Sequence, residues 1–358
     1  MADTRPRDLL TDELLERLGG APAGGWPSGE AGVGESGVSF GASGSGTGSS
    51  SGSSFGTGGG ARQVARTISR DIAKLDAAGY LKITLPREFG GLGCTMRQAA
   101  CGQRRLARHA ALTALALSAH LYWTGAAADA YRAGDDSARW ILHEAARGAL
   151  FASGHGEPGN DLRFASPDSR CEPSGEMGYL FRHPSVLSTV TPEWDWVAVH
   201  GITGDRRPDA VLAFAGRGAR CTPAFRVARV LPAGTPSDVF TSSATAWGNS
   251  LLASVEYSYA RRCFNDAVIA LDRRHDASAG VHPLDQWPVA ESSLRLDEMK
   301  SKIAEITHPW PLIPEQGPDL GGQRLIGLYT MRHNVADGAA HVHRLVHEIS
   351  TSPAVAAL

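Results

Sequence analysis

This sequence has no long apolar run, no excess of charge of either sign and no paired cysteines, and each absence excludes a class of protein. Its 358 residues include 35 Lys and Arg against 37 Asp and Glu, which gives a formal net charge of −2. No overall basic field is therefore available to attract nucleic acid or an anionic membrane surface. No apolar run approaches the roughly 20 residues needed to span a bilayer. We expect a soluble protein with neither a nucleic-acid nor a membrane partner.

The five cysteines are scattered, odd in number and without a C-x-x-C pair. Such usage fits a reducing cytoplasm better than an exported disulfide framework. No charged and then apolar leader precedes Leu9, which also favours a cytoplasmic protein. We predict that all five thiols act as small buried hydrophobes: Cys94, Cys101, Cys171, Cys221 and Cys263.

A segment from about residue 20 to residue 60 consists mainly of Gly and Ser with almost no charge. It cannot bury enough apolar area to offset the entropy lost on ordering, so we predict a disordered tether. Apolar residues at helical spacing precede it over residues 8–18 and follow it over residues 61–78. The second of these helices places four apolar side chains on one face: Val64, Ile68, Ile72 and Leu75.

Beyond residue 95 the spacing of apolar residues is helical, then typical of strands, then helical again. Helical patterns fill residues 96–150, and short apolar runs bounded by Gly and Pro predict strands at 178–181, 194–199, 210–214 and 225–230. Helical spacing returns at 243–271, 290–306 and 323–348. Because strands and helices do not alternate, a doubly wound sheet is not expected.

This order predicts an α+β fold in three parts. Residues 1–150 would form an N-terminal helical domain that carries the Gly and Ser insertion. Residues 151–235 would form a small antiparallel β domain, and residues 236–358 a C-terminal helical bundle.

The most informative stretch is Gly79-Tyr80-Leu81-Lys82-Ile83-Thr84-Leu85-Pro86-Arg87-Glu88-Phe89-Gly90-Gly91-Leu92-Gly93. Gly79 can adopt the left-handed conformation that ends a helix, and Pro86 with the later glycines can hold a tight crossing before the next helix. An ordinary stable loop could use the same residues. Taken together, however, the stretch resembles the N-terminal signature of acyl-CoA dehydrogenase-type flavoproteins.

A second segment, Ser153-Gly154-His155-Gly156-Glu157-Pro158-Gly159-Asn160-Asp161, formally satisfies G-x-G-x-x-G. A dinucleotide-binding loop of that kind must open a helix, whereas Pro158 interrupts the motif and further prolines follow. The segment instead resembles the first flavin loop of the acyl-CoA dehydrogenase family. Ser188 and Thr189 resemble its second flavin segment, although a strand-end turn explains these two hydroxyls equally well.

This resemblance implies a bound FAD, and it implies roles for particular residues. Ser153, His155, Gly156, Ser188 and Thr189 would contact the flavin, and Arg274 would reach the flavin diphosphate of a neighbouring subunit. The segment His120-Leu121-Tyr122-Trp123 resembles one that faces an acyl-thioester pocket, so His120, Tyr122 and Trp123 would contact substrate. A packed aromatic core at a helix end is the alternative for that segment. Oligomers are also implied, either of identical chains or with an intact relative.

The C-terminal histidines do not predict a metal site. His343 and His347 share a helix face, but no third ligand of fixed spacing joins them.

The activity implied by the resemblance is FAD-dependent oxidation of the CH–CH bond beside an acyl thioester. That reaction needs a carboxylate base, and the helix entered at Trp247-Gly248-Asn249 has none at its start. Glu256, Asp337 and Glu348 remain as candidates, and none of them is assigned. Two alternatives stay open: a flavin-dependent monooxygenase on the same fold, which can dispense with the base, and a non-catalytic subunit.

Overall fold

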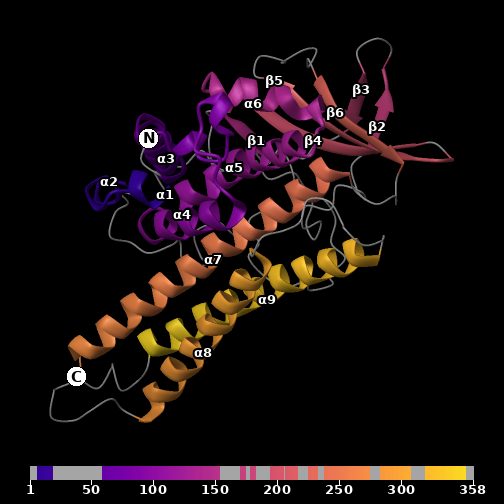
Figure 1. The fold of residues 1–358 in the computed structure, drawn as a ribbon. Coiled ribbons are helices and arrows are strands. Elements are labelled where there is room, and N and C mark those ends of the chain that lie inside the picture. Colours follow the sequence, from indigo (N-terminus) through magenta and orange to yellow (C-terminus); the bar gives the residue numbers. More distant parts are fainter. Residues whose placement is uncertain are drawn as a thin grey trace.

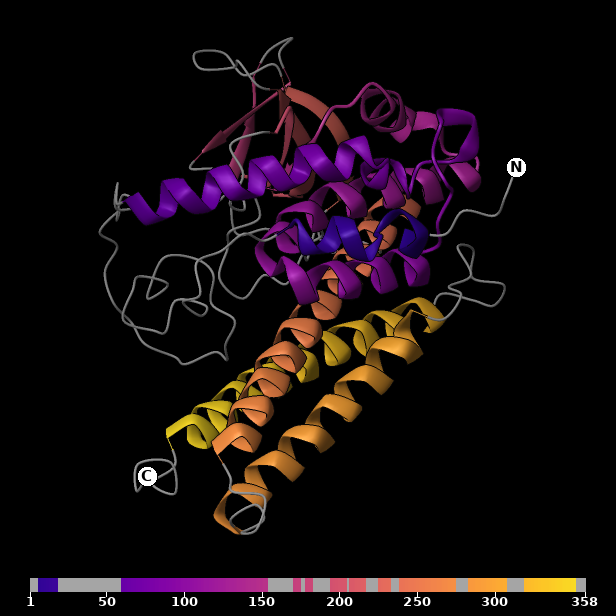
Figure 2. The ribbon, with the colours of Figure 1, turned by 90° about the vertical axis from the view of Figure 1, so that its left-hand side faces the viewer.

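The computed structural model describes ten ranges of the chain: residues 6–18, 59–153, 170–174, 178–182, 194–204, 206–216, 225–232, 238–274, 283–307 and 319–351. The tether predicted between residues 20 and 60 lies almost wholly outside these ranges. Figures 1 and 2 show an N-terminal group of helices next to a sheet, with three long helices extending away from both. The predicted α+β class is confirmed.

The N-terminal helices pack around one buried helix, α5 (Ala111–Arg132). Almost every residue of α5 from Thr113 to Ala130 is buried, because alanine and leucine occur on all of its faces. Three helices pack directly on it: α3 (Gly59–Ala77), α4 (Met96–His109) and α6 (Arg139–Ala146). The two short helices α1 (Pro6–Leu9) and α2 (Asp12–Glu16) pack against α4. The prediction of one helix over residues 8–18 is wrong, since Thr11 ends the first helix and caps the second by accepting a hydrogen bond from the Leu14 amide.

The stretch after α3 forms the tight crossing that its glycines and proline predict. Gly79 has a φ of 78° and Gly90 a φ of 80°, the left-handed values that favour glycine. Two short 3₁₀ turns lie within it, η1 (Tyr80–Lys82) and η2 (Arg87–Phe89), and a third, η3 (Asp136–Ala138), precedes α6. A Cβ on Gly91 would lie 2.2 Å from the Leu85 carbonyl oxygen, so the turn closes only with glycine at that position.

The sheet has six strands in the described residues, β1 (Phe151–Ser153), β2 (Arg170–Pro173), β3 (Tyr179–Arg182), β4 (Trp196–Thr203), β5 (Asp209–Gly216) and β6 (Phe225–Pro232). Their order is β3-β2-β4-β5-β6, and β1 pairs with β4. Three pairings are antiparallel, but β1 and β2 run parallel to β4, so the sheet is mixed. The sequence pattern missed β1, which has only three residues, and β2, whose sequence Arg170-Cys171-Glu172-Pro173 lacks the short apolar run that identified β3.

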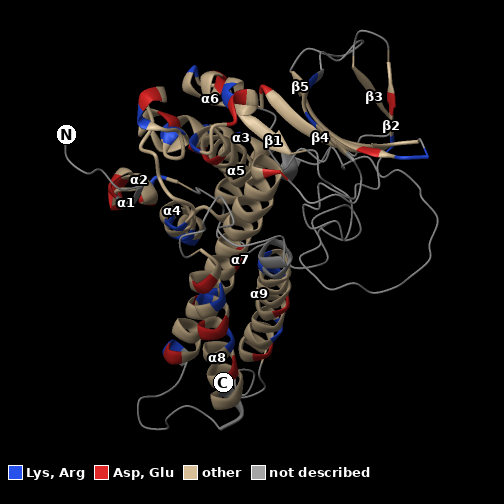
Figure 3. Cartoon of the chain, turned by 45° about the vertical axis from the view of Figure 1, so that its right-hand side comes forward, with Lys and Arg blue, Asp and Glu red and all other residues tan. Residues whose placement is uncertain are grey.

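Three long helices complete the chain: α7 (Val239–Arg274), α8 (Pro283–Ile306) and α9 (Asp319–Thr351). The first half of α7 packs against α4 and α5, and its second half packs against α9 (Figure 2). All three helices match the predicted ones and extend them by a few residues at one or both ends. Figure 3 shows charges of both signs interspersed along them. Among the helices of the described residues, none is both long enough and apolar enough to cross a membrane.

The cysteines divide between the core and the surface. Cys94 and Cys171 are buried as predicted, Cys263 is half-buried and Cys101 is exposed. The prediction is wrong for Cys101 because that residue lies on the outward face of α4, where its sulfur accepts a hydrogen bond from Arg104. Cys221 lies outside the described residues.

Candidate functional site

Four of the residues predicted to bind flavin or substrate meet where α5 packs against β1. His120, Tyr122 and Trp123 come from the middle of α5, and Ser153 is the last residue of β1. All four are buried, and we call them the α5–β1 cluster. The strand brings Ser153 to the helix because β1 pairs in parallel with β4, which fixes Ser153 opposite Ala198.

Tyr122 is the polar centre of this cluster. Its hydroxyl lies against the side chains of Ser153 and Trp123, which both act to lower its pKa, although complete burial raises the pKa by more. Among the described residues, no atom reaches this hydroxyl with full hydrogen-bond geometry. A buried hydroxyl is costly unless it is satisfied, so this position suits a polar ligand atom.

Trp123 forms an aromatic wall beside Tyr122. Its ring centroid lies 4.9 Å from that of Phe214 on β5, edge to face, and 5.9 Å from that of Phe240 on α7, stacked. Its side chain has no exposed area. These rings join the sheet, α5 and α7 and fill the space between them, so a long acyl chain could not lie there without moving them.

His120 is committed to the backbone through both ring nitrogens. Nε2 lies 2.9 Å from the Leu81 carbonyl oxygen, and the Phe151 amide donates to Nδ1 at 3.4 Å. This pairing assigns the neutral ring with the proton on Nε2. Burial lowers the pKa of His120 to about 4, although the hydrogen bond to Leu81 and the carboxylates of Asp76 and Asp195 raise it. We therefore interpret His120 as a residue that positions the cluster.

A largely buried carboxylate that sequence reasoning missed, Asp129, lies two turns further along α5, and its side chain is 13 % exposed. Asp129 accepts hydrogen bonds from Trp247 Nε1 at 2.8 Å and Ser243 Oγ at 3.1 Å, and it pairs with Arg132 at 2.5 Å. Burial raises the pKa of Asp129 above its usual value, although these three partners oppose the shift. The signal in the sequence was a single acidic residue inside an alanine-rich apolar helix.

Trp247 also fixes how closely α5 and α7 approach. A Cβ on Gly125 would lie 2.6 Å from the Trp247 ring, so the indole packs directly on the α5 backbone. The two helices therefore meet at the one position on α5 that has no side chain to move aside.

The three carboxylates considered as catalytic bases are held elsewhere. Glu256 forms a two-point ion pair with Arg332 at 2.5 and 2.7 Å, and its side chain is only 2 % exposed. Asp337 pairs with His333 on α9, which packs against α7 and α8. Glu348 lies beside Ile349, which contacts Ala267, 20 residues along α7 from Trp247, or about 30 Å.

The structure does not test the remaining predicted site residues. His155, Gly156, Ser188 and Thr189 lie outside the described ranges. Arg274 is the last residue of α7, 27 residues beyond Trp247, and its side chain is not described.

The C-terminal histidines form no metal centre in the part of the chain that the structure describes, where no group of three or more His, Cys, Asp or Glu side chains could hold an ion. His343 instead packs edge to face on Tyr259, with ring centroids 5.2 Å apart. His347 is exposed.

Several solved structures have the same arrangement of helices and sheet as this chain. Nitrososynthase from Micromonospora carbonacea var. africana matches with a TM-score of 0.61 and 17 % identity over 82 % of both chains. KijD3, solved in complex with FMN and dTDP-3-amino-2,3,6-trideoxy-4-keto-3-methyl-D-glucose, matches with a TM-score of 0.59 and 18 % identity over 83 % of this chain and 86 % of that one. Dibenzothiophene monooxygenase TdsC from Paenibacillus sp. A11-2 matches with a TM-score of 0.56 and 15 % identity over 83 % of this chain and 87 % of that one.

At these identities the likeness concerns the fold. No protein-family profile matches the chain, and no curated protein sequence does.

Proposed function

We propose that this chain, whose fold is that of the acyl-CoA dehydrogenases, is a flavin-dependent monooxygenase that acts on a small molecule. The fold supports a flavin enzyme, and KijD3 and TdsC supply relatives of the same architecture, one solved with FMN and one a monooxygenase by name. The proposal departs from acyl-thioester oxidation, the activity that the sequence resemblance implies.

The observation that carries this choice is the placement of Glu256. Removing a proton beside a thioester carbonyl needs a carboxylate that is free to accept it next to the substrate. Glu256 is the one candidate base that lies on α7, the helix that packs against the cluster. It is buried in a two-point ion pair with Arg332. An oxygenation does not need that base, so the arrangement favours it.

The α5–β1 cluster fits a flavin at one point that can be tested. The Tyr122 hydroxyl is buried beside Ser153 and lacks a full hydrogen bond among the described residues. The ring edge of a flavin presents donors and acceptors that such a hydroxyl could satisfy. We propose that Ser153, His155, Gly156, Ser188 and Thr189 hold FAD. Tyr122 and Trp123 would contact substrate, and the Tyr122 hydroxyl would also bond to the flavin edge beside Ser153. Arg274 would serve the flavin of a second copy.

When bound, reduced flavin would activate oxygen for transfer to the substrate. The residues of this chain would shape and dry the site. Trp123, Phe214 and Phe240 exclude water from one side, since their rings are fully buried. His120, uncharged at neutral pH, anchors α5 to β1 and so keeps Tyr122 beside Ser153.

The first test is whether the purified chain takes up FAD, followed by visible absorption. Tyr122→Phe should weaken FAD binding about fivefold, because one hydrogen bond contributes roughly 1 kcal/mol. Tyr131→Phe is the matched control, since it removes a hydroxyl from the same helix nine residues away and should leave binding unchanged. A chain that stays colourless with excess FAD would contradict the proposal.

The second test separates oxygenation from dehydrogenation. With reduced flavin supplied by a reductase, consumption of oxygen coupled to an oxygenated product is expected. Reduction of bound flavin by an acyl thioester without oxygen would establish the dehydrogenase instead. If neither activity is found in a chain that binds flavin, the non-catalytic subunit becomes the better explanation.

We also propose that the C-terminal helices pair with another chain. Trp287 is 68 % exposed and Leu294 64 %, and they lie two turns apart on the same face of α8. Such large apolar side chains are normally covered by a partner when they lie close together. Sedimentation equilibrium should therefore find a dimer or a larger oligomer, and Trp287→Ser should weaken it.

A further inference from the structure

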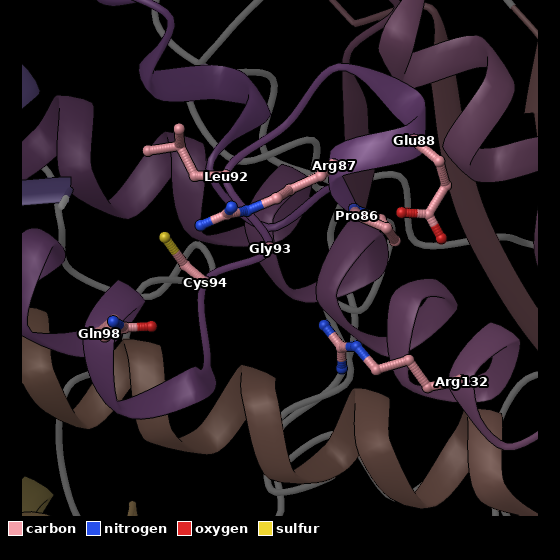
Figure 4. Close-up of a pocket in the computed structure, with 8 residues that line it drawn as sticks. All are labelled: Pro86, Arg87, Glu88, Leu92, Gly93, Cys94, Gln98 and Arg132. Carbon is pink, nitrogen blue, oxygen red and sulfur yellow. The ribbon is translucent and has the colours of Figure 1, made fainter. Parts of the chain in front are cut away.

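A cavity of about 430 Å³ lies on the N-terminal helical group, apart from the α5–β1 cluster. Its walls come from the turn around η2, the start of α4 and the end of α5 (Figure 4). This volume is in the range of pockets that hold small molecules. Arg87 and Arg132 both line this space from different elements: in Figure 4 the Arg87 guanidinium group lies on the side of Leu92 and Cys94, and that of Arg132 reaches in from the end of α5.

The wall that carries Arg87 is rigid. The Gly91 amide donates to the Pro86 carbonyl at 3.2 Å, the Gly93 amide to the Leu85 carbonyl at 2.8 Å, and the Cys94 amide to the Ile83 carbonyl at 2.8 Å. Gly90 and Gly93 complete the turn with left-handed φ values of 80° and 64°. A backbone this fully bonded holds the cavity open before any ligand arrives.

The wall that carries Arg132 is anchored to the core. Its guanidinium pairs with Asp129 at 2.5 Å, and Asp129 is itself held by Trp247 and Ser243. The Arg132 side chain is nevertheless 40 % exposed, so donors remain on its outer side. An arginine oriented in this way loses less entropy on binding an anion than a free surface arginine does.

We infer that this cavity binds a phosphoryl group of a small molecule. A phosphoryl group has three acceptor oxygens and carries up to two negative charges, so two guanidinium groups from different walls favour it over a single carboxylate, which has two oxygens and one charge. Gln98 adds an amide at the same wall as Cys94, and its cap on α4 uses only Oε1. Glu88 also lines the pocket, and its carboxylate offsets one positive charge. Because a carboxylate accepts hydrogen bonds, the ligand would also carry a hydrogen-bond donor.

This site is separate from the proposed flavin and substrate site. Arg132 is ten residues beyond Tyr122 on α5, which is about 15 Å along the helix axis. The inference therefore does not depend on flavin binding, and its test can be read without activity.

The experiment is calorimetric titration of the full chain, in low salt, with three probes: pyrophosphate, ADP and succinate. Pyrophosphate or ADP should bind, and succinate should bind at least tenfold more weakly. Arg87→Gln should lower phosphoryl affinity roughly ten- to a hundredfold, the range for losing a charge-assisted hydrogen bond. Arg108→Gln, which removes an exposed arginine from α4 outside the cavity, should change affinity less than twofold.

A second variant distinguishes a loss of binding from a loss of folding. Arg132→Lys keeps the charge beside Asp129 but loses the fork, so it should weaken phosphoryl binding while the melting temperature stays near that of the parent. ADP binding more tightly than pyrophosphate would identify an organic diphosphate, and equal affinities would identify free phosphate; both support the inference. No binding at millimolar concentrations, equal losses for Arg87→Gln and Arg108→Gln, or succinate binding as tightly as pyrophosphate would each overturn it.

Discussion

The two halves of α7 are held in place by different physical means. The first half meets α5 through aromatic rings, with Trp247 on Gly125 and Phe240 on Trp123. From Glu256, at the middle of the helix, onward, α7 meets α9 through the Glu256–Arg332 ion pair and then a small apolar cluster around Leu271. α7 is a continuous helix of 36 residues, so both kinds of contact act on one rigid element.

The difference shows which contacts of α7 fix the relative positions of the helices most closely. Stacked and edge-to-face rings tolerate little displacement, and they surround the proposed site. A buried ion pair specifies which helices meet but adds little net stability compared with apolar packing of equal volume. We therefore expect the first half of α7 to determine site geometry and the second half to determine how the helical bundle assembles.

Trp247→Ala should produce the largest loss, because the indole is 2 % exposed and its removal leaves a cavity and an Asp129 without one donor. We expect a decrease of about 4 kcal/mol in the free energy of unfolding, measured with urea. Ile269→Ala on the same helix is the control, since that side chain is 49 % exposed and its truncation should lower the free energy of unfolding by about 1 kcal/mol or less. Equal losses would remove the distinction between the aromatic interface and the surface.

Glu256→Gln should cost about 3 kcal/mol, because Arg332 is then left partly buried without its counter-charge. The double variant Glu256→Leu with Arg332→Leu should recover most of that stability, since apolar residues of similar size can replace a buried pair. A double variant no more stable than the single one would show that the ion pair contributes stability as well as specificity.

Acid should act through His120 more than through His343. Burial lowers the pKa of both, to about 4 for His120, so each is harder to protonate when folded. As pH falls, the unfolded chain therefore binds the proton before the folded chain does. The contribution of each neutral histidine to the free energy of unfolding is fully present above about pH 6.5 and is lost as pH falls toward 4. For His120 this amounts to about 3 kcal/mol. In urea titrations at pH 7 and pH 4.5, the free energy of unfolding should change less between the two pH values for His120→Gln than for His343→Gln.

Gly125→Ala should give the smallest effect, about 2 kcal/mol, because the new Cβ would lie 2.6 Å from the Trp247 ring and the indole must shift. In a helix without that neighbour, alanine in place of glycine would be stabilising. A neutral or stabilising Gly125→Ala, measured by thermal melting, would therefore show that α5 and α7 can separate freely.

Much of the fold was predictable because its signals are local. Apolar spacing predicted α3, α7, α8 and α9 close to their observed limits. Gly79 predicted the end of α3 because few other residues tolerate its left-handed conformation. The resemblance carried by residues 79–93 also led to the correct fold, although the activity it implies stays a proposal.

The candidate site was only partly predictable. Tyr122, Trp123 and Ser153 were named separately for substrate and flavin, and their meeting was implied only by family resemblance. Asp129 was missed because its hydrogen-bond partner Trp247 lies 118 residues away in the chain, and no local pattern reports such a contact. Arg132 was missed for a related reason, since an arginine at a helix end usually indicates only a solvated surface.

The sequence alone determined where the longer helices and strands lie, since those choices follow from side-chain periodicity and from glycine and proline over a few residues. The tertiary structure alone decided that the Trp247 indole packs on the bare backbone of Gly125, that Asp129 is buried beside it, and that Arg87 and Arg132 face one cavity. These arrangements depend on how closely rigid elements approach one another, a distance set by packing between residues far apart in the chain.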